Sequence, residues 1–171
     1  MRSAKNILGL WLAVILQFGV MFTSSAQTKL YRFSCVANDR VLVAQEGNLS
    51  TVSSSSLANQ VAIEHLFIIK WIGSDCYIAS ASDNSLFLKR EGANVVLGSL
   101  SADQSPSVSF KWRIDYAGSN HGVLSASDDA SQCLFMANDG SLSMVNGHKH
   151  VISLADKNHI RFVISSSVST F

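Results

Sequence analysis

Beyond residue 26, the chain consists of short runs in which apolar and polar side chains alternate. These runs are rich in Val, Ile, Leu and Phe, and Ser, Asn, Asp and Gly separate them. Alternation with a period of two is typical of β-strands that bury one face, and no segment sustains apolar residues at helical spacing. The best helical candidate, Ser56 to His65, offers only Leu57 and Val61 on one face and is expected to form a single turn. The pattern therefore predicts an all-β fold.

The pattern recurs in three copies, at about residues 29–72, 75–116 and 121–166, and each copy holds four strand-like runs. The fourth run of each copy carries a basic residue followed by an aromatic one: Lys70-Trp71, Lys111-Trp112 and Arg161-Phe162.

Alternation along these fourth runs separates an inward face from an outward face. It directs Trp112 and Phe162 inward together with their aliphatic neighbours, and in the first copy Ile69 and Trp71 take the inward places. The basic side chains then face outward and solvate the exterior of the sheet. We therefore expect the aromatic residues to pack in the core rather than to stack on a ligand.

The second and third runs of each copy read as hairpins. Arg40–Leu49 aligns without gaps on Cys133–Leu142, which places Gly47 and Gly140 in turns that favour a positive φ. In the middle copy, Ser82 to Asn84 is predicted to form the turn before Leu86 instead, so the match with the other two copies is looser there. A single set of about 40 residues has too small a core and exposes strand edges, whereas three sets around an axis can close six strands into a barrel and cap it with three hairpins.

These residues resemble the β-trefoil superfamily of the fascin, fibroblast growth factor and interleukin-1 type. The similarity is carried by RVLVAQEGNL and by the run from Lys111-Trp112 through VLSAS, CLFMAND and GSLSMV to IRFVIS. The resemblance implies a β-trefoil of twelve strands in three four-strand repeats. The Gln-x-Trp signature of ricin-type lectins is missing, because Ile69 and Phe110 stand where it has Gln, and there is no basic cluster of the kind that binds heparan sulfate.

The first 26 residues are typical of a signal peptide, with Arg2 and Lys5 before an apolar run and small residues at the end. The run from Ile7 to Phe22 is short for a membrane span. Cleavage after Ala26 leaves 27–171 as one domain, with 11 basic and 12 acidic residues. This balance gives no reason to expect nucleic acid as a partner. We expect a secreted monomer with no stable membrane span after cleavage.

Three cysteines follow the signal peptide: Cys35, Cys76 and Cys133. A disulfide is possible in an oxidising compartment, and buried unpaired thiols are equally compatible with the sequence.

The connections between the third and fourth runs, at residues 53–64, 99–106 and 147–158, are the expected binding surface, because loops on a rigid scaffold commonly carry function. The candidate binding residues within them are Asn59, Gln60, Asp103, Gln104, His148, Lys149 and His150. Asn48-Leu49-Ser50 is a glycosylation sequon at a hairpin tip, so Asn48 is a candidate acceptor if the source is eukaryotic.

The residue patterns suggest no catalytic centre, metal site or cofactor. His148 and His150, with His121 or His159 nearby, lack a zinc-binding spacing, and Asp128-Asp129 reads as turn chemistry.

We therefore expect a secreted, non-catalytic recognition protein that binds an extracellular protein or a glycan. The alternative is a trefoil-type protease inhibitor that presents 117–121 or 147–149 to an enzyme. A hydrolase that depends on His121 or Asp129 is the weakest hypothesis.

Overall fold

The computed structural model describes residues 28–57, 62–100, 106–118, 120–147 and 154–169, which form twelve strands in three sets. The first set comprises β1 (Thr28–Cys35), β2 (Arg40–Gln45), β3 (Asn48–Ser53) and β4 (Phe67–Ile72). The second comprises β5 (Asp75–Ser80), β6 (Leu86–Glu91), β7 (Asn94–Ser99) and β8 (Trp112–Tyr116). The third comprises β9 (His121–Ala126), β10 (Gln132–Met136), β11 (Leu142–Asn146) and β12 (Arg161–Ser169). The all-β prediction is confirmed.

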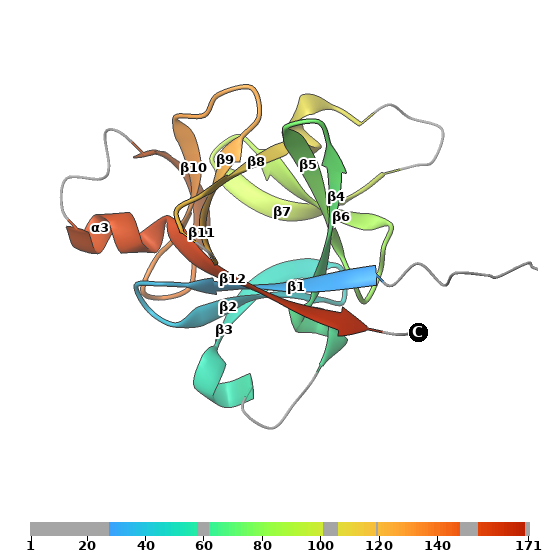
Figure 1. The fold of residues 1–171 in the computed structure, drawn as a ribbon, viewed down its shortest axis with the longest axis horizontal. Helices are drawn as coiled ribbons and strands as arrows, with labels where there is room; N and C mark the ends of the chain where they lie inside the picture. Colours follow the sequence, from blue (N-terminus) through green and yellow to red (C-terminus); the bar gives the residue numbers. More distant parts are fainter. Residues whose placement is uncertain (1–27, 58–61, 101–105, 119, 148–153, 170–171) are drawn as a thin grey trace, which may run out of the picture.

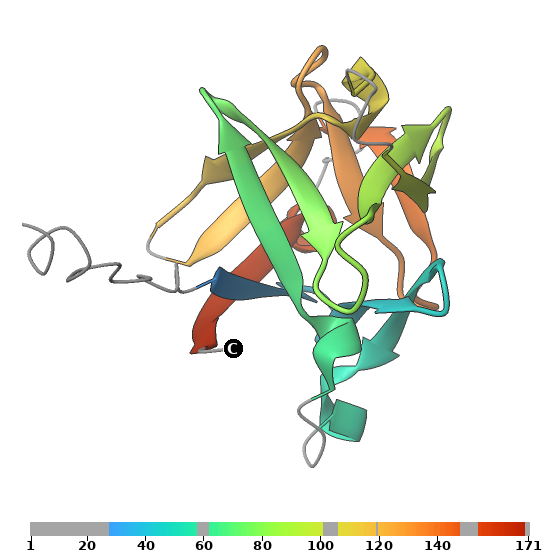
Figure 2. The ribbon, with the colours of Figure 1, turned by 90° about the vertical axis from the view of Figure 1, so that its right-hand side faces the viewer.

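Six strands pair in a closed ring in the order β1, β4, β5, β8, β9 and β12, and β12 returns to β1. Each of these pairings is antiparallel, and closure gives every strand of the ring a neighbour on both sides. Figure 1 shows the three sets arranged around a common centre, and Figure 2 shows the β4–β5 hairpin in green along the wall.

The remaining strands form three hairpins, β2–β3, β6–β7 and β10–β11, at the cap end of the barrel. The turn of the first hairpin contains Glu46 and Gly47 with φ of 51° and 78°, as a two-residue turn requires. In the second set, the hairpin turn is formed by residues 92–93, because Glu91 pairs with Asn94. The predicted turn at Ser82 to Asn84 does precede Leu86, but it joins β5 to β6 and is not the turn of the β6–β7 hairpin.

The ungapped alignment of the first and third hairpins is also wrong, by one residue. Ser34 of β1 pairs with Val41, and Ser125 of β9 pairs with Cys133. Val41, and not Arg40, is therefore the counterpart of Cys133. The third turn is one residue longer than the first. This extra residue compensates for the shift at the start of the hairpin, so Gly47 and Gly140 align in the sequence although the strands before them do not.

The centre of the barrel holds six side chains that are 0% exposed and that come from six different strands: Phe33, Phe67, Ile78, Trp112, Leu124 and Phe162. Trp112 satisfies its polar atom there, because its Nε1 donates to the carbonyl oxygen of Leu88 at 3.0 Å. The expectation that Trp112 and Phe162 lie in the core is confirmed.

The expectation that Trp71 lies in the core is wrong, because its side chain is 46% exposed. Strand pairing explains the error. Phe67 lies opposite Ser80 in the same way that Trp112 lies opposite Ala126, so Phe67 is the counterpart of Trp112. Trp71 lies four residues farther along β4. Its side chain therefore points to the same face of the strand as Phe67, but it lies beyond the end of the core.

Helical structure is limited to short segments within the described residues. The single-turn prediction near Ser56 to His65 agrees with two 3-10 turns, η1 (Ser54–Leu57) and η2 (Ile63–His65). A third, η3 (Val108–Phe110), precedes β8, and α3 (Leu154–His159) precedes β12 without having been predicted. No helix of these described segments has the length and apolar character needed to cross a bilayer.

Candidate functional site

The end of the barrel opposite the hairpins, which we call the mouth, exposes aromatic side chains. Trp71 at the end of β4 and Tyr116 at the end of β8 are 46% and 50% exposed. They occupy equivalent positions, because each lies four residues after the buried aromatic residue of its strand, Phe67 or Trp112. The third equivalent position is held by Ser166 of β12, which is also exposed.

Two further side chains lie just inside the mouth. Tyr31 of β1 is partly buried and packs against the core, and the Lys29 ammonium lies 5.4 Å from the centre of its ring. Cys76 of β5 is fully buried opposite Trp71, and burial raises the pKa of its thiol to about 12. Burial also raises the pKa of the Tyr116 phenol, with smaller effects of Tyr31 and Cys76 in the same direction. These two dependences place Tyr116 close to both groups.

The mouth suits a ligand with apolar faces and no net charge. Trp71, Tyr116, Tyr31, Ser166 and Cys76 are all neutral at pH 7, and the aromatic rings offer flat surfaces for stacking. Trp71 lies opposite Cys76, and Cys76 lies opposite Trp112, so Tyr116 lies four residues farther along β8 than the level of Trp71, which is about 13 Å at the usual rise of a strand. Only an extended ligand can therefore contact both rings.

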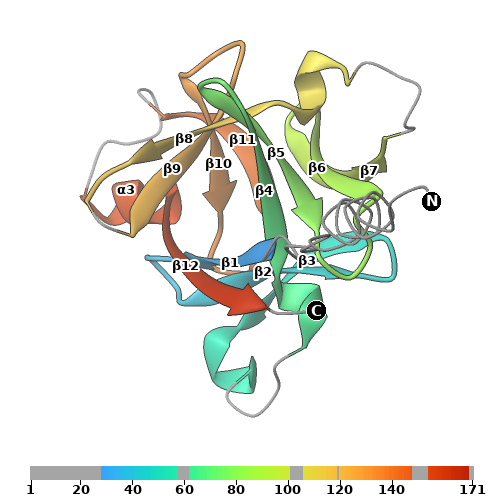
Figure 3. The same cartoon turned by 45° about the vertical axis from the view of Figure 1, so that its right-hand side comes forward.

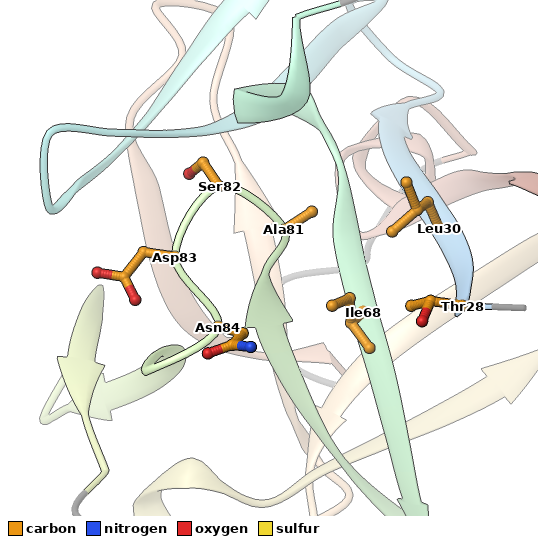
Figure 4. A pocket seen from close by; sticks show the side chains of 7 residues that line it. All are labelled: Thr28, Leu30, Ile68, Ala81, Ser82, Asp83 and Asn84. Atoms are coloured by element: carbon orange, nitrogen blue, oxygen red, sulfur yellow. The ribbon is translucent and has the colours of Figure 1, made fainter. Parts of the chain in front are cut away.

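A separate polar pocket of about 520 Å³ lies outside the barrel. Figure 4 shows Thr28 and Leu30 of β1 and Ile68 of β4 on one side, facing the segment from Ala81 to Asn84 that joins β5 to β6. Asp83 is the only ionisable side chain that lines it among the described residues.

The aspartates near these turns have structural partners. Asp83 Oδ1 accepts hydrogen bonds from the Ser85 backbone nitrogen and hydroxyl at 2.9 and 2.7 Å, which lowers the pKa of Asp83. Asp129 makes the same two bonds with Ser131, at 3.0 and 2.6 Å, with the same effect on its pKa. Asp128 instead forms an ion pair with Arg90 at 2.8 Å. Asp128 and Asp129 therefore engage different partners, as expected for turn chemistry.

Comparison with solved structures identifies the architecture. The designed threefold-symmetric protein ThreeFoil matches 82% of this chain and 99% of its own, with a TM-score of 0.58 and 13% identity. The fold is a β-trefoil. A mosquitocidal holotoxin matches with a TM-score of 0.63 at 13% identity, over 83% of this chain and 17% of the toxin chain.

The GlcNAcα1-4Gal-releasing endo-β-galactosidase from Clostridium perfringens also matches the trefoil, with a TM-score of 0.63 at 9% identity, over 81% of this chain and 32% of that enzyme. The trefoil thus spans only a small part of two of these proteins. No protein-family model matches the sequence, and no curated protein matches it either.

The binding residues predicted from the sequence lie outside the described residues. They are Asn59, Gln60, Asp103, Gln104, His148, Lys149 and His150. The elements that flank their loops, η1 and η2, η3, and α3, lie on three different sides of the trefoil (Figures 1 and 3). These flanking elements do not form one continuous surface.

The other candidates from the sequence fall at separate places. Asn48 is exposed at the first hairpin, where its side-chain nitrogen donates to the Glu46 carbonyl oxygen at 3.3 Å. His159 contacts the Met136 carbonyl oxygen through Nδ1 at 2.6 Å and packs against the Phe135 ring. The described residues contain no cluster of three potential metal ligands. Cys35, Cys76 and Cys133 are buried free thiols.

The turn between β8 and β9, one candidate for an inhibitory loop, is short and held by its backbone. The Ala117 nitrogen donates to the His121 carbonyl oxygen at 2.8 Å, and the Ile164 nitrogen donates to that of Asn120 at 2.7 Å. These two bonds tie both ends of the turn to the barrel. Residue 119 of this turn, and residues 148 and 149 of the other candidate loop at 147–149, lie outside the described residues, so the inhibitor hypothesis stays a prediction.

Proposed function

We propose that this trefoil is a secreted, non-catalytic recognition protein that binds an extracellular glycan through its mouth. The observation that carries the proposal is the pair of half-exposed aromatic side chains, Trp71 and Tyr116, at equivalent positions on the rim. Export rests on the signal-like residues 1–26. A sugar ring presents apolar C–H faces and neutral hydroxyls, which matches a rim of neutral aromatic and hydroxyl side chains.

Two further observations support a glycan over a charged macromolecule. The side chains that form the rim and its floor, Tyr31, Trp71, Cys76, Tyr116 and Ser166, are neutral, and the Lys29 ammonium beside the Tyr31 ring adds a single positive charge. In addition, a similar trefoil occurs in an enzyme named for releasing a disaccharide from a galactose-containing glycan. Asn48 stays a candidate glycosylation site, on a hairpin at the opposite end of the barrel.

The test is a paired screen of the secreted chain on a glycan array and on an array of extracellular proteins. We expect glycan binding that falls about 30-fold in Trp71→Ala, because truncation of a central aromatic contact typically costs about 2 kcal/mol. Tyr116→Ala should weaken binding as well. Val108→Ala, which removes an equally exposed apolar side chain from η3, is the matched control and should bind normally.

Binding that is unchanged in both aromatic variants would place the site elsewhere. Binding to proteins alone would replace the glycan with a protein partner. No detectable binding on either array would count against a recognition function.

A further inference from the structure

A second cavity, of about 500 Å³, lies on the outside of the barrel in the third repeat. Its apolar wall includes Val123 of β9, Cys133 of β10 and Ile160 at the start of β12. Lys157 of α3 and Arg161 of β12 line it as well. The volume falls within the range of small-molecule sites, which are mostly apolar with a few polar groups.

The three repeats fill this location differently. Strand pairing makes Val123, Cys133 and Ile160 the counterparts of Tyr77, Phe87 and Phe110 in the second repeat. There the three rings pack together in a small apolar cluster, with the centroids of Tyr77 and Phe87 6.4 Å apart in an edge-to-face arrangement. The third repeat has three smaller side chains at the same places. The cavity therefore lies where the second repeat has three aromatic rings.

The second repeat also shows how cations sit around such rings. Lys70 Nζ lies 4.8 Å from the centre of the Phe87 ring, and Lys89 Nζ lies 5.7 Å from that of Phe110. Cations above aromatic faces at these distances are attracted by the ring. In the third repeat, Lys157 and Arg161 border the cavity without a ring of the protein inside it.

The charge at the cavity wall favours an anion. Within the described residues, neither Lys157 nor Arg161 forms an ion pair. Three carboxylates of this region are not among the lining residues: Asp115 lies opposite Val123 on β8, Asp129 is bonded to Ser131, and Asp156 precedes Lys157 on α3. Two cations beside an apolar wall are complementary to a ligand that carries a negative group on an apolar body.

From this arrangement we infer that the cavity of the third repeat binds a small aromatic carboxylate. The ring occupies the space that Tyr77, Phe87 and Phe110 fill in the second repeat, and the carboxylate pairs with Arg161 and Lys157. This site lies on the outer wall of the barrel and is independent of the glycan proposal for the mouth.

The test uses 2-naphthoate as the probe, titrated into the whole secreted chain and followed by its fluorescence. The neutral isostere 2-naphthylmethanol should bind about tenfold more weakly, because it lacks the charge. Arg161→Gln should lower the affinity for 2-naphthoate by a similar factor. Lys111→Gln removes the basic residue at the equivalent position of the second repeat and is the matched control, with unchanged affinity expected.

Filling the cavity provides the second arm. Val123→Tyr restores the residue found in the second repeat, and Ala130→Phe reaches the cavity from an exposed loop, so that one substitution serves if the other impairs folding. Both should abolish 2-naphthoate binding, whereas Trp71→Ala should leave it intact. Naphthoate binding that survives both filling variants, equal affinity for the neutral isostere, or no binding at millimolar probe would overturn the inference.

Discussion

Truncation of Phe67 tests the assignment of the core of the first repeat. The Phe67 ring is 0% exposed and packs edge-on against Phe33, with ring centroids 5.7 Å apart. Phe67→Ala should therefore leave a cavity in the centre of the barrel, at a cost of about 3–5 kcal/mol in the free energy of unfolding. That cost is a large part of the roughly 5–15 kcal/mol by which domains are stable.

Trp71→Ala is the comparison, because the sequence pattern placed this side chain in the core. Trp71 is only about half buried, so the loss of roughly 80 Å² of buried apolar surface at about 25 cal/mol per Å² amounts to about 2 kcal/mol. Urea unfolding followed by circular dichroism measures the loss of stability in both variants. We expect the unfolding midpoint to shift and the dependence of the free energy on urea concentration to stay the same. If Trp71→Ala destabilised the chain as much as Phe67→Ala, the four-residue correction would be refuted.

Two further predictions concern buried titratable groups. His65 is buried at the counterpart of Phe110, and burial, together with the Arg32 charge, lowers its pKa from the ordinary 6.5. Its neutral form is favoured in the folded state, so stability is full above pH 6.5 and falls as the pH drops toward the lowered pKa. His65→Phe should flatten the dependence of the unfolding midpoint on pH between 7 and 5, and an unchanged dependence would contradict this reasoning. The two thiols that line no cavity described above, Cys35 and Cys76, should react with Ellman's reagent only after denaturation, since burial raises the pKa of each; rapid reaction of either thiol in the native protein would contradict its burial.

The sequence was sufficient for the fold class because the inward positions of a strand repeat every two residues. The alternation of side chains along β8 and β12 correctly identified Trp112 and Phe162 as core residues. Alternation tells which face of a strand a side chain is on, but not how far along the strand the core extends, since Trp71 and Phe67 lie on the same face of β4. Only the pairing of Phe67 with Ser80 settles that question, and pairing across strands is not written in a local pattern.

The same limitation hid both candidate sites. Tyr31, Trp71 and Tyr116 are far apart in the sequence, and Trp71 was expected to lie in the core, so the mouth emerged only from ring closure. The cavity of the third repeat depends on Val123 and Ile160 being smaller than Tyr77 and Phe110. The fourth runs already aligned Ile160 with Phe110, but only strand pairing shows that Val123, Cys133 and Ile160 correspond to the three rings of the cluster in the second repeat.

The central claim is that the mouth of the trefoil binds a glycan through Trp71, and an indole NMR titration tests it most directly. In the ¹⁵N-labelled secreted chain, from which the expected cleavage after Ala26 removes Trp11, two indole resonances remain, from Trp71 and Trp112. On addition of the oligosaccharide selected by the glycan array, the Trp71 resonance should shift while that of the buried Trp112 stays in place. A saturating titration that leaves the Trp71 resonance unmoved would contradict the account.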